Sequence, residues 1–440
     1  MDNSRRKYTR KKQSSNKDTG RRVSQLTTEL GTTGLKTSSG QITEEFLTQL
    51  DGEKGLRVYR EMAENDPTVS AVLFAIEMLI RSVHWSAEPV TQEKEDVERA
   101  EFLESCLQDM ELPFTEVISE ILTMLPYGFS IHEIVYKLRM GRTTKSQSNY
   151  DDAKIGWKKL PIRAQDTIDL WNLTDKGELE SITQVAPPNY NSTIIPSEKF
   201  LLFRTAARYG NPQGRSILRS AYRPWYFKKK IEEFEAIGVE RDLAGLPTAY
   251  VPPELLYENA GAKEKAMLAE IKKIVRNVRM DSQMGIVFPQ AFDDSGNRLY
   301  EFKLLSAPGG KQFSTNEIIV RYDQRIAMTV LADFILMGQS NVGSFALSSS
   351  KTMMFSTALG AWLDSIASMF NREAIPKLFA VNGWTGPVPK LMHGDIETPD
   401  LGELGGYVTA LANAGASLFP DDKLERHLRR MARLPEPEVK

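Results

Sequence analysis

The fold of this chain is decided by the stretch from residue 314 to residue 376, which reads STNEIIVRYDQRIAMTVLADFILMGQSNVGSFALSSSKTMMFSTALGAWLDSIASMFNREAIP. Ser314 and Glu317 have the spacing of a helix-capping box. Apolar residues then recur at every fourth position from Ile318 to Phe334. No Gly or Pro occurs between Ile318 and Met337. This pattern predicts a helix over residues 318–337, about 30 Å long at 1.5 Å per residue.

The remainder of this stretch contains an uncharged loop and a second helical pattern. Residues 338–350 include no charged side chain. From Lys351 onward apolar residues again recur at helical spacing, and we expect Pro376 to end that helix because proline has no N–H to donate. The periodic positions are Met354, Ala358, Trp362, Ile366 and Phe370. Two long helices joined by such a loop are also typical of a core hairpin with a surface connection.

Length and composition indicate a globular protein of several modules. A chain of 440 residues can bury more than one core, so we expect two to four modules. Its 41% apolar and 26% charged residues fit a soluble protein, and its longest apolar run is interrupted by Glu77. The basic, polar N-terminus is not typical of a secretory signal. The single Cys106 excludes internal disulfides and cysteine-cluster metal sites, and we expect it to be buried.

The first forty residues differ from the rest in charge. They hold ten Lys or Arg against three Asp or Glu, which leaves 46 basic against 55 acidic residues elsewhere. With few apolar residues, this tail is predicted to be disordered until it binds a partner. Its basic residues are candidates for contact with phosphates or an acidic protein surface, and a solvated tail without a partner is the alternative.

Residues 41–212 are predicted to form an α+β module, because helical patterns are followed by a series of strand patterns. Asp66 and Pro67 have the signature of a helix start, with the helix running to about Val83. We interpret residues 141–152 as a polar linker. The other expected helices cover 92–110 and 113–127, and the expected strands cover 85–89, 129–138, 157–162, 167–172, 179–184 and 200–203.

From Gly210 onward the sequence pattern is mainly helical, and a compact insert is predicted between two long helices. Arg215, Arg219 and Arg223 share one face of a helix expected from 214 to 238, in which Pro224 either introduces a kink or starts a new helix. After a turn at 245–247, the insert is predicted to contain a helix over 262–280 and strands at 286–288 and 299–305. Four basic residues occupy the outer face of the insert helix: Lys272, Lys273, Arg276 and Arg279. Helical patterns return at 401–418 and 422–434.

Six segments, taken in order, carry a family resemblance. They are Glu64–Val69, Gly214–Lys230, Leu246–Pro253, Gly285–Pro289, Gly338–Ser340 and Ile375–Gly383. With these segments the chain resembles the portal proteins of tailed bacteriophages, in particular the Mu-like and thermophilic-phage-like branch, over about residues 50–385. No single segment decides this resemblance, but their order and spacing are specific.

The resemblance implies an α+β portal fold that assembles into a ring, usually of twelve copies, at one vertex of the capsid. The genome enters and leaves through such a ring. The expected parts are a basic tail (1–40), a wing (41–212), a first stem helix (213–241), a clip (242–313), a second stem helix (314–337), a tunnel loop (338–350), a long wing helix with its return (351–399) and a crown (400–440).

The resemblance places the loop between the two long helices at the DNA tunnel. An uncharged loop suits this place, because fixed Lys or Arg would add phosphate contacts and slow the DNA. The expected tunnel residues are Gln339, Ser340, Asn341, Val342, Ser344, Phe345, Ser348, Ser349 and Ser350. Candidates for other DNA or partner contacts are Lys351, Lys272, Lys273, Arg276 and Arg279.

The resemblance also implies the partners and the location of the protein. The expected partners are further copies of the chain, double-stranded DNA, the large subunit of the terminase motor, a head–tail adaptor and the major capsid or scaffolding protein, but no membrane. The expected location is the virion, with assembly in the host cytoplasm.

Enzyme chemistry is the competing class. The sequence has no phosphate-binding Walker motif and no zinc-protease motif, and Ser340 lacks the closing Gly of a nucleophile elbow. His393, Asp395 and Glu397 are the one candidate metal cluster, and structural histidines are the favoured interpretation. We therefore expect no catalytic site, no metal and no cofactor. The alternative is a metal-dependent DNA-processing enzyme of a phage.

Overall fold

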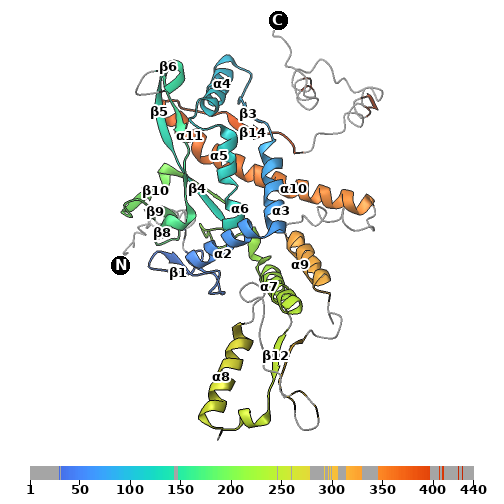
Figure 1. The fold of residues 1–440 in the computed structure, drawn as a ribbon. Helices are drawn as coiled ribbons and strands as arrows, with labels where there is room; N and C mark the ends of the chain where they lie inside the picture. The colour runs from blue at the N-terminus through green and yellow to red at the C-terminus, as the bar shows by residue number, and fades with distance from the viewer. Residues whose placement is uncertain are drawn as a thin grey trace, which may run out of the picture. The chain divides into compact units, whose positions relative to one another are not determined.

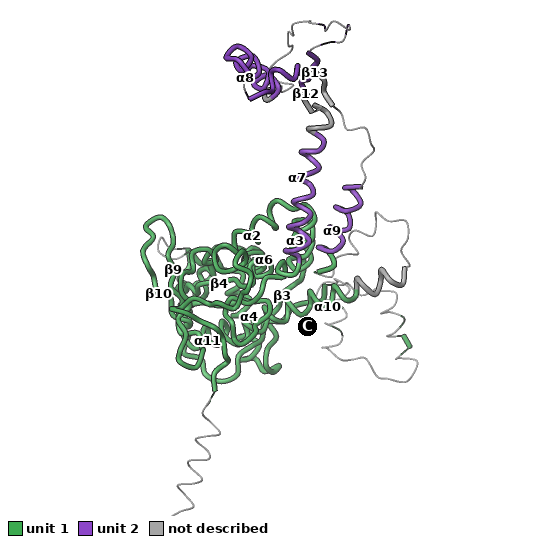
Figure 2. Tube along the Cα trace, turned by 90° about the horizontal axis from the view of Figure 1, so that it is seen from below, with its two compact units in different colours: residues 1–220, 327–440 green, residues 221–326 purple. Residues whose placement is uncertain are grey.

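The computed structural model divides the chain into two compact units. Unit 1 comprises residues 1–220 and 327–440, and unit 2 comprises residues 221–326 (Figure 2). Within the described residues, no helix is both long and apolar enough to cross a membrane. The structure describes residues 31–142, 147–244, 246–258, 260–277, 300–305, 314–329 and 345–396, and single positions at 29, 292, 296, 298, 406, 409, 410, 425 and 429.

The N-terminal part of unit 1 contains two consecutive helices, α2 (Gly52–Asn65) and α3 (Pro67–Arg81), which meet at Asp66. The Asp66 carboxylate accepts hydrogen bonds from the backbone N–H groups of Thr68 and Val69, each at 3.0 Å. Because the intervening proline has no N–H and the carboxylate satisfies the next two donors, α3 begins where the sequence predicts.

Short antiparallel sheets form the middle of unit 1. Two sheets have three strands each, in the orders β11–β4–β7 and β10–β9–β8, and three pairs join β1 to β2, β3 to β14 and β5 to β6. The strands are β1 (Thr37–Ser38), β2 (Gln41–Ile42), β3 (Trp85–Glu88), β4 (Phe129–Glu133), β5 (Val135–Arg142), β6 (Gln147–Lys159), β7 (Ile162–Arg163), β8 (Ile168–Leu173), β9 (Leu179–Val185), β10 (Ser192–Pro196), β11 (Phe200–Arg204) and β14 (Lys390–His393).

The core of unit 1 joins segments that are far apart in the sequence. Figure 1 shows α10 crossing α3, and residues of α10 contact α3, β11 and β14. Phe370 and Phe379 are fully buried together with Trp157 of β6, and Cys106 is also buried, as expected. The remaining helices of unit 1 are α4 (Lys94–Gln108), α5 (Phe114–Ile121), α6 (Met124–Tyr127), α10 (Phe345–Met369) and α11 (Ile375–Val381).

The prediction that Pro376 ends the second long helix is wrong. A π-helical turn at Phe370–Ala374 follows α10, and α11 continues the helix to Val381 with Pro376 in its first turn. The first N–H groups of a helix have no partner inside it, so a proline there removes no hydrogen bond. In the π-helical turn the backbone hydrogen bonds change their spacing before Pro376 is reached. The chain therefore stays helical through the proline.

The interpretation of residues 141–152 as a linker is also wrong, because the described residues of this range, 141–142 and 147–152, belong to the paired strands β5 and β6. Polar side chains of both strands contact α4 or Asp109, the residue that follows it. Lys137 and Asp109 form an ion pair of 2.9 Å, and both are buried. The Arg139 guanidinium lies 4.1 Å from the ring centre of Tyr150 and 5.1 Å from that of Phe102. Polar strands are stable here because a helix provides their partners.

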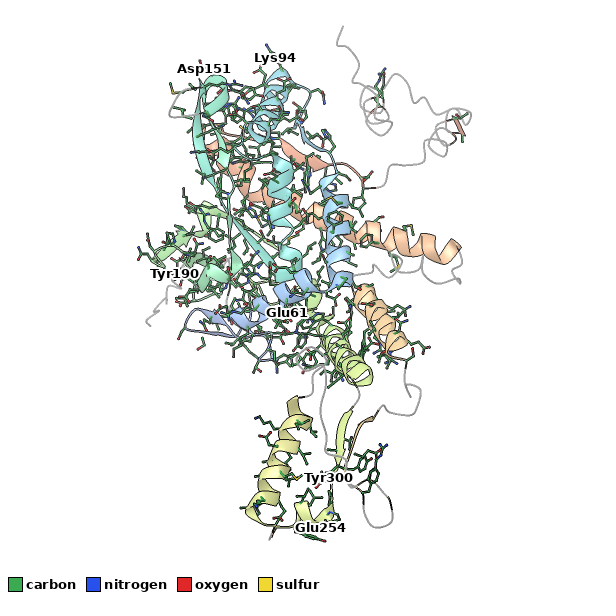
Figure 3. The ribbon with its side chains drawn as sticks, in the orientation of Figure 1. Glu61, Lys94, Asp151, Tyr190, Glu254 and Tyr300 are labelled. Atoms are coloured by element: carbon green, nitrogen blue, oxygen red, sulfur yellow. The ribbon has the colours of Figure 1, made fainter. Side chains whose placement is uncertain are left out.

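Unit 2 contains two helices and a small α/β insert between them. Strand β12 (Leu246–Tyr250) pairs antiparallel with β13 (Glu301–Leu305), and α8 (Ala262–Asn277) precedes β13 in the sequence. The Tyr300 hydroxyl lies 3.9 Å from the Met267 sulfur of α8 (Figure 3). The helices on either side of the insert are α7 (Tyr222–Ala244) and α9 (Thr315–Thr329), of which residues up to 326 belong to unit 2.

Three predicted boundaries in this region are wrong. The first helix begins at Tyr222, not 214, because Gly214 has a positive φ of 58° and Ser216 has extended backbone. It continues past Gly238 to Ala244. The expected turn at 245–247 contributes Leu246 and Pro247 to β12 instead, which a strand at the edge of a sheet tolerates. Part of the predicted insert, the strand at 286–288, lies outside the described residues.

Candidate functional site

The structure describes only the second part of the uncharged segment 338–350. Gln339, Ser340, Asn341, Val342 and Ser344 lie outside the described residues. Phe345, Ser348, Ser349, Ser350 and Lys351 lie in the first two turns of α10. The expectation that the loop extends to Ser350 is therefore wrong. No Gly or Pro occurs after Gly343 until Gly360, and serine costs a helix only a few tenths of a kcal/mol, so the helix starts six residues earlier than Lys351.

Helix α10 has a core-bound end and a free end. Phe355, Leu359, Leu363 and Ile366 are buried in the core of unit 1. Before them, Met353 and Met354 are 63% and 56% exposed. Figure 1 shows this N-terminal end projecting from the body of unit 1. The loop that precedes α10 therefore joins the free end of a helix whose other end is fixed.

Two asparagine side chains anchor the core-bound end of this helix. Asn371, in the π-helical turn, accepts from Leu391 N at 2.7 Å and donates to Leu391 O at 3.0 Å. Asn382, just after α11, accepts from Ile155 N and donates to Ile155 O, both at 2.8 Å. Each amide thus binds both backbone groups of one strand residue, one in β14 and one in β6.

The two helices of unit 2 pack as an antiparallel pair. The ring of Phe227 in α7 stacks on that of Tyr322 in α9, with 6.4 Å between their centres. About two turns further along α7, the Glu235 carboxylate accepts a hydrogen bond from the Thr315 hydroxyl. The contact therefore moves backward along α9 as it moves forward along α7, which defines the antiparallel direction. Figure 2 shows the two helices side by side.

An ion pair is enclosed between these two helices. The Lys228 ammonium lies 2.6 Å from the Asp323 carboxylate and 4.0 Å from that of Glu232. The Lys228 side chain is 4% exposed and that of Asp323 is 22% exposed. The sequence does not predict this pair, because Lys228 and Asp323 lie on separate helices whose faces meet only in the packed structure.

The structure describes three of the four basic residues predicted on the insert helix. Lys272 and Lys273 are exposed on α8, and Lys273 lies 3.8 Å from Glu270 on the same helix. Arg276 belongs to the last turn of α8. Arg279 lies outside the described residues.

The structure assigns other contacts to the candidate metal residue His393. Its Nε2 lies 3.1 Å from the Asp364 carboxylate, and its Nδ1 lies 2.9 Å from the Gly394 carbonyl oxygen. Asp395 is exposed, and Glu397 lies outside the described residues. In the part of the chain that the structure describes, no group of three or more His, Cys, Asp or Glu side chains is placed to hold a metal ion.

Two solved structures define the class of this fold. The chain resembles one from the virion of a native gene transfer agent particle, with a TM-score of 0.50 and 11% identity over 95% of this chain and 99% of that one. It also resembles one from the neck of a native gene transfer agent particle with C12 symmetry, with a TM-score of 0.51 and 10% identity over 96% and 100%. This confirms the predicted mixed helix-and-sheet fold.

The family follows from a match over most of the chain. The model of the portal protein of Mu bacteriophage matches residues 56–429. The chain therefore belongs to this family of phage portal proteins. The predicted function, a portal for the phage genome, is confirmed by this match.

Proposed function

We propose that the chain assembles into a closed ring of identical copies at one capsid vertex, and that double-stranded DNA passes through the ring during packaging and ejection. The ring is a channel and a docking platform, without a catalytic site or a cofactor of its own. The observation that carries this proposal is the set of apolar helix faces that the described residues of the chain leave uncovered.

Helix α3 is apolar on two opposite faces. Val72 and Ile76 are buried in the core of unit 1, whereas Phe74 and Met78 are 62% and 37% exposed. At 100° per residue, Phe74 and Met78 each lie about 160° around the helix from Ile76. A helix that is apolar all round is typically covered on all sides. We therefore expect a second protein surface to cover the outer face of α3.

Helix α7 of unit 2 has a similar outer face. Tyr226 and Phe234 lie two turns apart and are 43% and 69% exposed, and Ile237 continues the same stripe. Large exposed apolar patches mark protein interfaces. Uncovered faces on both units fit a head-to-tail interface, in which each copy presents two different surfaces and the ring closes on itself.

We propose twelve copies per ring. The C12 symmetry of the gene transfer agent neck supports this number, since a chain of that neck shares the fold over nearly its whole length. The proposed location is the portal vertex of the virion, and the location during assembly is the host cytoplasm. The remaining proposed partners are the terminase large subunit, a head–tail adaptor and the major capsid or scaffolding protein.

The parts of the chain have proposed roles. The α+β body of unit 1 is the wing, α7 and α9 are the stem, and the insert with α8, β12 and β13 is the clip that docks the motor and later the adaptor. The loop at 338–344, extended by the free end of α10, borders the tunnel. The C-terminal residues 400–440 form the crown. An insert with its own sheet suits docking, because it can engage a partner while the helix pair stays intact.

Substitution of Phe74 tests the ring. Phe74→Asp places a charge on the outer face of α3 without removing a core side chain, so the wing should fold and the ring should dissociate. Tyr190→Asp is the matched control, because Tyr190 is 66% exposed and lies in the β9–β10 turn, away from the helices (Figure 3). Negative-stain images and native mass spectrometry measure both. Wild-type protein that stays monomeric at micromolar concentration in varied salt would contradict the proposal.

A further inference from the structure

One flank of the α7–α9 pair carries three arginines around two stacked rings. The Arg223 guanidinium lies 5.9 Å from the ring centre of Phe227. Arg321 and Arg325 lie 5.5 Å and 5.8 Å from the ring centre of Tyr322. Since the two rings stack on each other, the three guanidinium groups share one surface of unit 2. We call this surface the arginine flank.

The arginine flank differs from the other cations of the pair in having no bound carboxylate. Lys228 pairs with Asp323, and Lys230 pairs with Glu233 at 2.6 Å. Among the described residues, no carboxylate lies within ion-pair distance of the three flank arginines, and all three are exposed. Within the described part of the chain, the flank is therefore a patch of three positive charges without a paired carboxylate.

The rings give these arginines a defined orientation. A guanidinium over an aromatic face gains about 0.5–1 kcal/mol at an exposed site. Its planar fork of donors is also held in place, so less rotamer freedom is lost when it binds an anion. Such a fork matches the two oxygens of a phosphate. A preoriented, unpaired guanidinium is a phosphate-binding group.

The spacing of the flank fits a repeated anion. Arg321 and Arg325 are one helical turn apart, about 6 Å along the axis of α9. Duplex DNA presents a phosphate about every 3.4 Å along each strand. Neighbouring arginines can therefore contact different phosphates, and Arg223 on the facing helix widens the contact. Because phosphate contacts carry no sequence information, such a surface accepts any genome.

We infer that the arginine flank binds the phosphate backbone of double-stranded DNA, as a repeated cationic band contributed by each copy. This inference rests on the proposed function, which brings DNA to the ring. It adds a phosphate-contacting surface on the two-helix pair to the uncharged loop predicted at 338–350. The stem would then bind the DNA backbone electrostatically while the loop leaves the DNA free to move.

Salt titration of DNA binding tests this inference. The purified full-length ring is mixed with a fluorescent 30-base-pair duplex, and the affinity is measured by anisotropy as a function of NaCl concentration. Each phosphate contact adds about 0.9 to the slope of log affinity against log salt. The triple variant Arg223→Gln/Arg321→Gln/Arg325→Gln should lower that slope by roughly 1–3.

Two further variants make the test specific. Lys54→Gln/Lys176→Gln/Lys199→Gln removes three exposed cations from unit 1 and should leave the slope unchanged. Arg223→Lys/Arg321→Lys/Arg325→Lys keeps the charges but loses the planar forks, so it should retain the slope and bind DNA more weakly. It also provides a folded variant should the glutamine form be unstable.

Several outcomes would overturn the inference. An unchanged slope in an intact triple-variant ring would show that the flank does not contact DNA. Loss of the ring with unaltered DNA binding would assign the flank to a neighbouring copy, and loss of terminase binding alone would assign it to an acidic protein. In each case the ring proposal stands. Wild-type protein that forms no ring would instead refute the proposed function.

Discussion

Lowering the pH should destabilise the wing through one buried histidine, His132 of β4. Its Nδ1 lies 2.9 Å from the Leu160 carbonyl oxygen, and its Nε2 lies 2.7 Å from the Ser130 hydroxyl. In the neutral ring, Nδ1–H donates to that carbonyl and Nε2 accepts from Ser130. The pKa of His132 is lowered from 6.5 to about 4, chiefly because burial disfavours the charged ring.

The sign and size of the effect follow from this pKa. The unfolded chain takes up a proton on His132 below about pH 6.5, whereas the folded chain resists it until about pH 4. Stability is therefore full above pH 6.5 and falls as the pH drops toward 4. The loss is about 1.4 kcal/mol per pH unit, or about 2 kcal/mol between pH 6.5 and pH 5.

Urea unfolding at a series of pH values from 7 to 5 measures this effect in the intact protein. Glu120, whose pKa burial raises, acts in the opposite direction, so the quantity to compare is the difference between wild type and His132→Asn. The variant will be less stable at pH 7, because it loses packing, but its stability should vary less with pH. His84→Asn is the control for losing an exposed histidine. Equal pH dependence of wild type and His132→Asn would refute the reasoning.

Two other perturbations have defined outcomes. Asp323→Ala removes the closest carboxylate from buried Lys228 and should cost about 3 kcal/mol in urea unfolding, whereas Lys228→Met with Asp323→Leu should recover most of this loss. An Asp323→Ala variant as stable as wild type would contradict the role of that ion pair. Ser340→Arg with Ser344→Arg should leave ring assembly intact and reduce the yield of nuclease-protected DNA, less so as salt is raised, with Ser340→Gln and Ser344→Gln as the control. Unchanged packaging by the arginine variant would count against a tunnel position for the loop.

Local capping signals in the sequence predicted the starts of α3 and α9. The N-cap at Asp66 was confirmed by two hydrogen bonds to its carboxylate, and Glu317 N donates to the Ser314 hydroxyl at 3.3 Å, as half of the predicted capping box. These signals depend on residues within one turn of each other. The sequence alone therefore contains everything that decides them.

Errors arose where distant residues decide the structure. Residues 147–152 look like a linker, yet Ser148 donates to the Asp109 carboxylate at 2.6 Å. Pro376 looks like a terminator, yet a preceding π-helical turn and the clamps from Asn371 and Asn382 carry the helix past it. Neither the strand that an asparagine will bind nor the width of a helical turn can be read from local periodicity.

The arginine flank shows the same limit at the candidate site. The sequence pattern predicts that Arg223 shares one helical face with Arg215 and Arg219. The structure instead places Arg219 in a short 3-10 turn (Ile217–Arg219), bound to Glu45 at 2.6 Å, and the Arg223 guanidinium near the ring of Phe227 in α7. Only the antiparallel packing of α7 and α9 stacks this ring on that of Tyr322. The part of the flank that the sequence itself shows is the spacing of Arg321, Tyr322 and Arg325, which lie within about one helical turn.

The anchoring of α10 gives a physical reason for the free end of this helix. Met353 and Met354, the first side chains described in this 25-residue helix, are exposed, so packing toward its other end stabilises it. Here the far end is held by buried Phe370, by core contacts from Phe355 onward, and by two amide clamps on separate strands. If the preceding loop borders the DNA tunnel, as proposed, movement of DNA against it would be transmitted along α10 to the core of unit 1. The exposed Met353 and Met354 lie where a neighbouring copy in a ring could support the same helix.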